Sequence, residues 1–226
     1  MVVCLTPSDA AEAAAARIAS ALQEAVARRG QAAVAFSGGK TPVLLLQALA
    51  LHAIPWTATH VFQVDERIAP DDHPDRNAVD LRLALLNHVA LPTTNIHLMP
   101  VSLTPAAQAA KVYQRILRNT AKGVLDVVHL GLGDDGHTAS LVPGDPVLHV
   151  QTQDVATTRP YNGRRRLTLT YPAIRRARSI VWLATGSSKL PMVKRLLAAD
   201  PTIPAGAMHP SGDQVLFLDA AAAPPS

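Results

Sequence analysis

Apolar residues recur along this chain at helical spacing in some segments and in continuous runs in others. Ile18 and Leu22 lie four residues apart, so they share one face of a helix that we expect to end at Gly30. We expect Asp9 and Glu12 to form a capping box near its start. Short apolar or β-branched runs follow, bounded by glycine or polar residues, and each of them predicts a buried strand.

Strands and helices are predicted to alternate along the chain. The strands are expected at 32–36, 59–64, 96–99, 124–130, 179–185 and 215–218, and the later helices at 41–49, 77–88, 104–120 and 188–197. Such alternation favours right-handed βαβ units and a mostly parallel central sheet with helices on both faces. We predict a single α/β domain at 1–219, followed by a disordered tail at 220–226 with the sequence AAAAPPS.

Composition narrows the class of protein. Hydrophobic residues make up 48% of the chain and charged residues 17%, below the usual ~25%, which excludes a disordered or coiled-coil chain. Every apolar stretch ends before the ~18 residues that a membrane helix needs, and no basic region precedes the first apolar run. Cys4 is the only cysteine, so an internal disulfide is excluded. We therefore predict a cytoplasmic protein that does not bind a membrane.

The net charge of +4 points to an anionic partner. Most of the excess lies in 159–178, and aromatic residues make up only 4% of the chain, so stacking platforms for nucleic acid are scarce. We expect a small anionic substrate rather than nucleic acid, with salt-dependent DNA binding through 164–166 as a remote alternative. We also expect a monomer or a weak homodimer.

Ligands of parallel sheets bind at the carboxyl ends of the strands, so the loops that follow the strands are the places to search for chemistry. The first such loop reads Ser37-Gly38-Gly39-Lys40-Thr41-Pro42 and leads into a helix. Its backbone amides at Gly38 and Gly39, together with Thr41, can cradle a phosphate, although the same loop can be a simple tight turn. A Walker A loop is excluded, because its spacing would need a glycine at Val34.

Three cationic candidates follow later strands. Arg67 closes the triplet Asp65-Glu66-Arg67, in which the carboxylates offer a base or an acceptor, unless the three simply pair at the surface. Arg166 begins an alternating segment and faces either the site or solvent. Lys189 lies near a helix start after the strand at 179–185, where it can bind phosphate or remain a surface lysine.

The loop at 131–140 carries the most distinctive residues. Its three glycines match a dinucleotide fingerprint, but Pro143 interrupts the chain where a long helix should follow. His137 lies at the end of a buried strand, two residues after Asp135, and an imidazole can take a proton from water and return it near neutral pH. His137 and Asp135 are therefore the candidate catalytic pair, and the other histidines are expected to be structural.

The sequence lacks the usual metal-binding patterns. HExxH is absent, thiolate ligands are missing, and no pair of histidines at helical spacing has a third ligand nearby. We expect neither a metal nor another cofactor.

The loops, taken in this order, resemble those of the 6-phosphogluconolactonase branch of a family that also contains glucosamine-6-phosphate deaminase. The segments that carry the resemblance are FSGGKTP, VDERIAPDDHPDRN, HLGLGDDGHTASLVPGDP, RLTLTYP, TGSSK and FLDAAAA, and they span nearly the whole chain. Deaminase relatives typically have DEY where this chain has Asp65-Glu66-Arg67, and a glutamate in the segment that here reads Ser140-Leu141-Val142-Pro143. The lactonase branch is therefore favoured.

The resemblance implies a Rossmann-like domain and hydrolysis of 6-phosphoglucono-1,5-lactone in the oxidative pentose phosphate pathway. His137 would deprotonate the attacking water and Asp135 would orient the imidazole, while Asp65 and Glu66 would hold Arg67. Asp65 is also predicted to be a catalytic residue. The predicted phosphate and substrate ligands are Gly38, Gly39, Thr41, Arg67, Arg166 and Lys189. An amino-sugar phosphate deaminase and a non-catalytic sugar-phosphate-binding regulator remain the alternatives.

Two positions depart from the family pattern. Arg76-Asn77 stands where the family usually has Ser-Asn, and Arg76 could add to anion binding there. Pro204-Ala205-Gly206 stands where the family has Pro-Ala-Ser, which we expect to change only a local turn.

Overall fold

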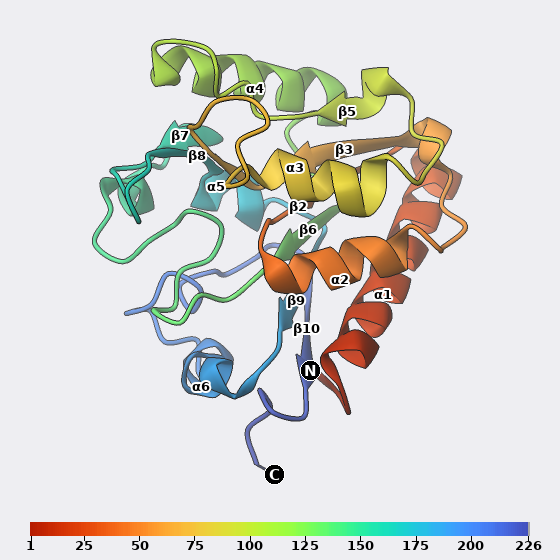
Figure 1. The fold of residues 1–226 in the computed structure, drawn as a ribbon, viewed down its shortest axis with the longest axis vertical. Coiled ribbons are helices and arrows are strands. Elements are labelled where there is room, and N and C mark those ends of the chain that lie inside the picture. The colour runs from red at the N-terminus through yellow and green to blue at the C-terminus, as the bar shows by residue number, and fades with distance from the viewer. Residues whose placement is uncertain (226) are drawn as a thin grey trace.

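A seven-stranded sheet forms the centre of the fold in a computed structural model, which describes residues 1–225 (Figure 1). The strand order is β1-β10-β9-β6-β2-β3-β5, and every neighbouring pair is parallel. The strands of this sheet are β1 (Val2–Cys4), β2 (Ala32–Phe36), β3 (Thr59–Gln63), β5 (Ile96–His97), β6 (Val127–Leu130), β9 (Ser179–Ala184) and β10 (Asp213–Asp219). The predicted parallel α/β architecture is confirmed.

Helices cover both faces of the sheet. One face packs against α1 (Pro7–Arg29), α2 (Lys40–Leu49) and the helical segment formed by α3 (Asn77–Leu81) and the π-helical turn η2 (Arg82–Leu86). The other packs against α4 (Ala106–Ala121), α5 (Tyr171–Arg175) and α6 (Leu190–Leu197). The 3₁₀ turns are η1 (Trp56–Ala58), η3 (Thr93–Asn95), η4 (Pro146–His149) and η5 (Ser187–Lys189). Both termini lie near β1 and β10 (Figure 1).

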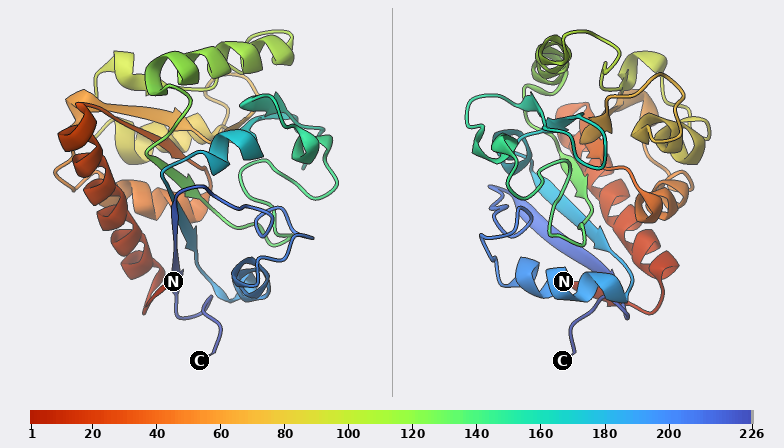
Figure 2. Two further views of the ribbon diagram at one scale, coloured as in Figure 1. Left: turned by 180° about the vertical axis from the view of Figure 1, so that it is seen from behind. Right: turned by 60° about the vertical axis from the view of Figure 1, so that its left-hand side comes forward.

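A small antiparallel sheet was not predicted. It consists of β4 (Asp65–Arg67), β8 (Arg166–Leu169) and β7 (Val155–Thr157), with β8 in the middle. In Figure 2 the teal strands of this sheet lie beside the main sheet, next to α4. Strands of three or four residues contain too few positions to show a period of two, so the sequence pattern did not reveal two of them.

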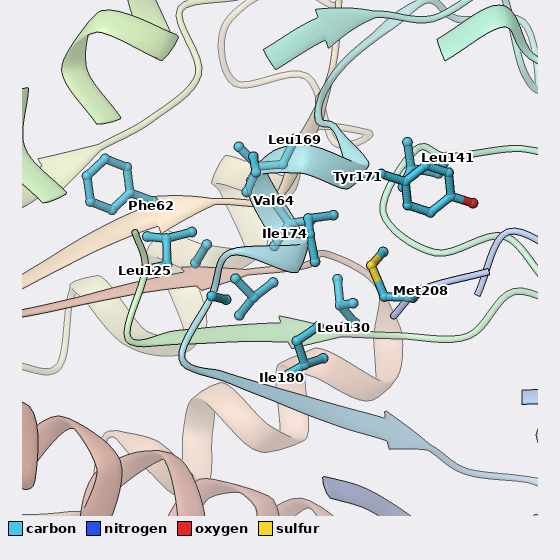
Figure 3. Close-up of a cluster of buried hydrophobic side chains, with 14 of the residues drawn as sticks. Phe62, Val64, Leu125, Leu130, Leu141, Leu169, Tyr171, Ile174, Ile180 and Met208 are labelled. Carbon is cyan, nitrogen blue, oxygen red and sulfur yellow. The ribbon is translucent and has the colours of Figure 1, made fainter. Parts of the chain in front are cut away.

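The core beneath α4 and α5 joins the two sheets. Leu130 of β6 and Ile180 of β9 meet Leu169 of β8 and Ile174 of α5, and all four side chains are buried (Figure 3). Tyr171 is also buried there and donates its hydroxyl to the Pro204 carbonyl at 2.9 Å. Because this contact surface is apolar and closely packed, the small sheet is fixed relative to the carboxyl ends of the main strands.

Several local predictions need correction. The capping box of α1 is formed by Thr6 and Asp9 rather than by Asp9 and Glu12, because Thr6 has the extended backbone of an N-cap and Asp9 is the third helical residue. Gly30 ends the helix in the left-handed region, as predicted. Gly206 has a tertiary role, since a Cβ there would lie 2.2 Å from the Asp200 carbonyl oxygen.

The ends of the chain are held by β10. Within the tail expected to be disordered, residues 220–225 have described positions, and the buried Ala222 donates its N–H to Asp219. Ser226 lies outside the described residues, so the boundary at 219 stays a prediction. Cys4 forms no disulfide within 1–225, and no helix in that range is long and apolar enough to cross a membrane.

Two histidines at the β3–β5 edge should make the fold sensitive to acid. Burial, followed by the charge of His60, lowers the pKa of His97 to about 4 from 6.5, and burial also lowers the pKa of His60. Between pH 4 and pH 6.5 the unfolded chain therefore binds more protons than the folded chain. The free energy of unfolding keeps the contribution of these histidines above pH 6.5 and loses it as the pH falls toward 4.

His97→Phe should reduce this loss of stability, because Phe can keep the stacking on Phe62 (ring centroids 4.4 Å apart) without titrating. The measurement is the urea midpoint between pH 7 and 4.5, with the exposed His149→Gln as control. An unchanged pH dependence in His97→Phe would show that other groups control the acid sensitivity.

Candidate active site

A cavity of about 730 Å³ opens at the carboxyl ends of the central strands. It is lined by all nine residues singled out from the sequence, namely Gly38, Gly39, Thr41, Asp65, Arg67, Asp135, His137, Arg166 and Lys189. The structure therefore brings together residues separated by as many as 151 positions, from Gly38 to Lys189. Their individual roles stay predictions.

His137 is held by Asp135. Asp135 Oδ1 lies 2.5 Å from His137 Nδ1 and also accepts the His137 backbone N–H at 3.0 Å. Partial burial alone would raise the pKa of Asp135, but the hydrogen bonds from the backbone and ring of His137 outweigh it and lower the pKa. An ionised Asp135 favours the tautomer with its proton on Nδ1, so Nε2 is left as a proton acceptor.

Tyr161 completes this arrangement and was missed from the sequence. Its hydroxyl donates to Asp135 Oδ2 at 3.1 Å, and its ring lies edge-on to His137 with centroids 5.5 Å apart. The Arg166 guanidinium stacks over the same ring, 5.1 Å from its centroid. Tyr161 lies in the turn between β7 and β8. The Asn-Gly pair that follows it is a turn signal, but it does not indicate which residues the turn contacts.

One wall of the cavity, the cationic wall, carries Arg67 and Arg166, and the pairing of β4 with β8 positions both. Arg67 lies directly opposite Arg166, and Asp65 lies opposite Thr168. Since residues two apart on a strand share a face, Asp65 and Arg67 both face the cavity. Glu66 faces the other way and does not line it. The guanidinium of Arg67 is held by the Asp75 carbonyl, with Nη1 at 2.5 Å.

Asp65 lies in the same wall and is buried. Ser140 Oγ donates to its Oδ2 at 2.5 Å, and Arg166 Nη1 reaches the same Ser140 hydroxyl at 3.4 Å. Burial raises the pKa of Asp65, while the Ser140 hydrogen bond and the charge of Arg166 oppose that rise. The Asp65 carboxylate forms hydrogen bonds with Ser140 and Asn77 and none with the Arg67 guanidinium, so it does not hold Arg67 directly as expected.

Glu66 organises the backbone instead. Its buried carboxylate accepts the N–H groups of Arg67, Asn77 and Ala78, each at 2.8 Å, as well as Gln63 Nε2 at 2.8 Å. Two of these donors are the first N–H groups of α3, which a carboxylate satisfies well. Glu66 thus holds Arg67 through its main chain.

Arg76 belongs to the same buried group. Its Nε lies 3.2 Å from Glu66 Oε2, and its Nη1 donates to Ala69 O at 3.1 Å and to Asp71 at 3.0 Å. Arg76 does not line the cavity, so its suggested contribution to anion binding is not supported by its position. It orders the loop before α3.

Asn77 links α3 to the first loop and was also missed. Its Nδ2 donates to the Asp65 carbonyl at 2.9 Å, whereas its buried Oδ1 has no hydrogen-bond partner within the described residues. A Cβ on Gly38 would lie 1.9 Å from that oxygen, so glycine is required there. Asn77 therefore presents an unused acceptor at the cavity wall.

The opposite wall holds Lys189. Its Nζ pairs with Asp134 at 2.7 Å, and Thr41 Oγ1 lies 3.2 Å from Thr185 Oγ1 nearby in the lining. Gly39 has a φ of 119°, which a side chain would disfavour, at the start of α2. Within residues 1–225, no group of three or more His, Cys, Asp or Glu side chains could hold a metal ion. The expected lack of a cofactor stays a prediction.

The fold and the site thus define a Rossmann-like α/β protein with a hydrogen-bonded Asp135–His137 pair in a cavity that also holds Arg67, Arg166 and Lys189. Residues 5–217 match the family described as glucosamine-6-phosphate isomerases/6-phosphogluconolactonase. This chain belongs to that family, as its loops predicted.

Individual relatives agree with this assignment. The chain is 42% identical to the 6-phosphogluconolactonase of a Synechocystis species over 211 residues, which cover 89% of this chain and 88% of the relative. The 6-phosphogluconolactonase structure from Thermotoga maritima matches with a TM-score of 0.87 at 27% identity, covering 96% and 99% of the two chains. A monomeric glucosamine-6-phosphate deaminase has the same fold, with a TM-score of 0.85 at 20% identity and coverage of 98% and 97%.

Glu66→Gln should destabilise the protein by about 3–5 kcal/mol, because it removes the charge that the buried Arg76 needs and places an amide donor against backbone N–H groups. The measurement is chemical unfolding. Asp71→Asn removes the other, exposed carboxylate beside Arg76 and should cost under about 1 kcal/mol. Equal losses in the two variants would contradict the organising role of Glu66.

Gly133→Ala should displace the His137 imidazole, since a Cβ there would lie 2.1 Å from His137 Nδ1. The ring-proton NMR signals of His137 should shift and kcat should fall about tenfold or more. Gly131→Ala, which has nothing within 4 Å of the added Cβ, should leave the His137 signals in place. Unshifted signals in Gly133→Ala would mean that the loop adjusts without moving the ring.

Proposed function

We propose that this protein hydrolyses 6-phospho-D-glucono-1,5-lactone to 6-phospho-D-gluconate, with His137 as general base and acid. The observation that carries the proposal is the hydrogen bonding of the two ring nitrogens of His137. Asp135 occupies Nδ1, and Nε2 has no hydrogen bond to any of the described residues in a cavity built around cations. The relatives named 6-phosphogluconolactonase, which match nearly the whole chain, support the choice of substrate.

The phosphate of the substrate would bind at the cationic walls. Arg67 can present a planar fork to a phosphate, and Lys189 a compact charge. Gly38, Gly39 and Thr41 would add donors at the start of α2, where the helix dipole also favours an anion. Lys189 would exchange its contact with Asp134 for the phosphate, which an exposed ion pair permits at little cost.

Hydrolysis then needs one base that can return its proton. Nε2 of His137 would take a proton from water as the water oxygen bonds to C1, and the carbonyl would become a tetrahedral oxyanion. As the oxyanion collapses, the bond from C1 to the ring oxygen breaks and Nε2 returns the proton to that oxygen. Asp135 would stabilise the imidazolium between the two steps. No covalent intermediate is required.

The site also favours hydrolysis over amino-sugar ring opening. Arg67 occupies the third position of the triplet, and Ser140 binds Asp65 rather than supplying a carboxylate to the cavity. A regulator that binds sugar phosphates without turnover would have no need of the Asp135–His137 contact. Both alternatives predict a protein that does not accelerate lactone hydrolysis.

The proposal extends to the substrate class and the cellular compartment. The substrate is a small phosphosugar lactone, and a reducing cytoplasm suits a chain whose single cysteine, Cys4, is free. A monomer or weak homodimer and the absence of nucleic-acid binding stay predictions.

His137→Ala should lower kcat for the lactone by about 10²-fold or more, because proton transfer to and from the reacting oxygens is lost. The substrate is generated from glucose 6-phosphate by its dehydrogenase, and proton release is followed above the spontaneous rate. Asp135→Asn should also lower kcat while leaving KM nearly unchanged, since it alters the imidazole rather than phosphate binding.

The exposed His149→Ala is the control and should keep full activity. If wild type and His137→Ala both hydrolyse the lactone rapidly, the proposed activity is supported and the proposed role of His137 is refuted. A wild type with no acceleration would refute the proposed function, and ammonia release from glucosamine 6-phosphate would then identify a deaminase.

A further inference from the structure

A second cavity, of about 500 Å³, lies at the opposite edge of the main sheet. Ser179 and Asp213, the first residues of β9 and β10, line it, together with Asp126, which directly precedes β6. The active site lies at the carboxyl ends of the strands, so the body of the sheet separates the two cavities. The proposed mechanism uses none of the residues of this second cavity.

Arginines dominate the lining. Five of them, contributed by α1 and by the segment between α5 and β9, face three carboxylates. They are Arg17, Arg28, Arg29, Arg176 and Arg178, and the carboxylates are Glu24, Asp126 and Asp213. The cavity therefore carries two more cations than carboxylates, which raises the local concentration of anions.

Arg176 pairs with Asp154 outside the lining, so the excess within the cavity comes from Asp126, which serves two guanidiniums. Asp126 Oδ1 is shared by Arg29 Nη2 at 2.6 Å and Arg178 Nε at 3.2 Å, and its Oδ2 accepts the Ala33 N–H at 2.8 Å. One buried carboxylate thus aligns two guanidiniums and has both oxygens engaged. Each guanidinium has five N–H donors, so most donors of Arg29 and Arg178 remain available for a ligand.

A second polar group points to a ligand independently. Ser179 is 5% exposed, and its hydroxyl has no hydrogen-bond partner within the part of the chain that the structure describes. A buried hydroxyl without a partner costs free energy, which a bound acceptor would recover. Ser179 is the first residue of β9 and lines the cavity next to Arg178.

We propose that this cavity binds a small phosphate-bearing anion. Guanidiniums fixed by a shared carboxylate match the planar, bidentate recognition of phosphate oxygens, and the Ser179 hydroxyl supplies a neutral donor. The volume suits a phosphorylated metabolite rather than a polymer. The site is independent of the proposed lactone hydrolysis. Arg28 and Arg29 offset the partial negative charge at the end of α1, which would otherwise repel an anion.

The test is a titration of ¹⁵N-labelled protein with inorganic pyrophosphate, followed by amide NMR. Saturable shifts are expected at Ser179 and Gly212, separate from any shifts at Gly38 and Gly39 in the active site. The double variant Arg28→Gln/Arg178→Gln should weaken binding at Ser179 about tenfold or more and leave kcat and KM for the lactone unchanged. Both side chains are largely exposed, at 70% and 54%, so folding should be preserved.

Arg115→Gln, an exposed arginine on α4 away from the cavity, is the control for net charge and should bind like wild type. Arg178→Lys keeps the charge but loses the fork, so it should bind with intermediate affinity. Absent shifts at Ser179, or an equal loss of affinity in Arg115→Gln, would overturn the proposal.

Discussion

The buried carboxylate of Glu66 is the contact on which the candidate site depends. It accepts hydrogen bonds from the end of β3, from β4 and from the first turn of α3, and it pairs with Arg76. Through it, the direction of β4 and the start of α3 are set together. Asn77 then reaches both Asp65 and the close approach at Gly38. A residue that never touches the cavity therefore determines the shape of one wall.

The second determinant is the register of β4 against β8. Antiparallel pairing places Arg67 opposite Arg166, and Arg166 stacks on Tyr161, which binds Asp135 and packs on His137. The cationic wall and the Asp135–His137 pair are thus connected by successive contacts. Because the charges are held by neighbouring groups before substrate arrives, little reorganisation is needed during reaction.

Charge is distributed unequally between the two edges of the main sheet. At the carboxyl edge, cations are combined with a histidine and its carboxylate, an arrangement suited to chemistry on a phosphorylated substrate. At the amino edge, arginines gather around Asp126 with an unpartnered hydroxyl at Ser179, an arrangement suited to binding alone. The linings of both cavities thus hold more cations than carboxylates, but the two cavities differ in the chemistry that they can support.

Local pattern in the sequence determined the parallel α/β class and nine of the residues that line the cavity, and the resemblance of the loops indicated the family. Buried strands, glycine turns and polar strand ends leave signals within short windows. The small sheet and the roles of Glu66, Tyr161 and Asn77 were decided by tertiary structure, whereas the Thr6–Asp9 cap of α1 is a local signal that was assigned to the wrong pair. Tyr161 lies 24 positions from His137, and Asn77 39 positions from Gly38. Such contacts depend on which strands pair and in what register, and no local period in a single sequence encodes that choice.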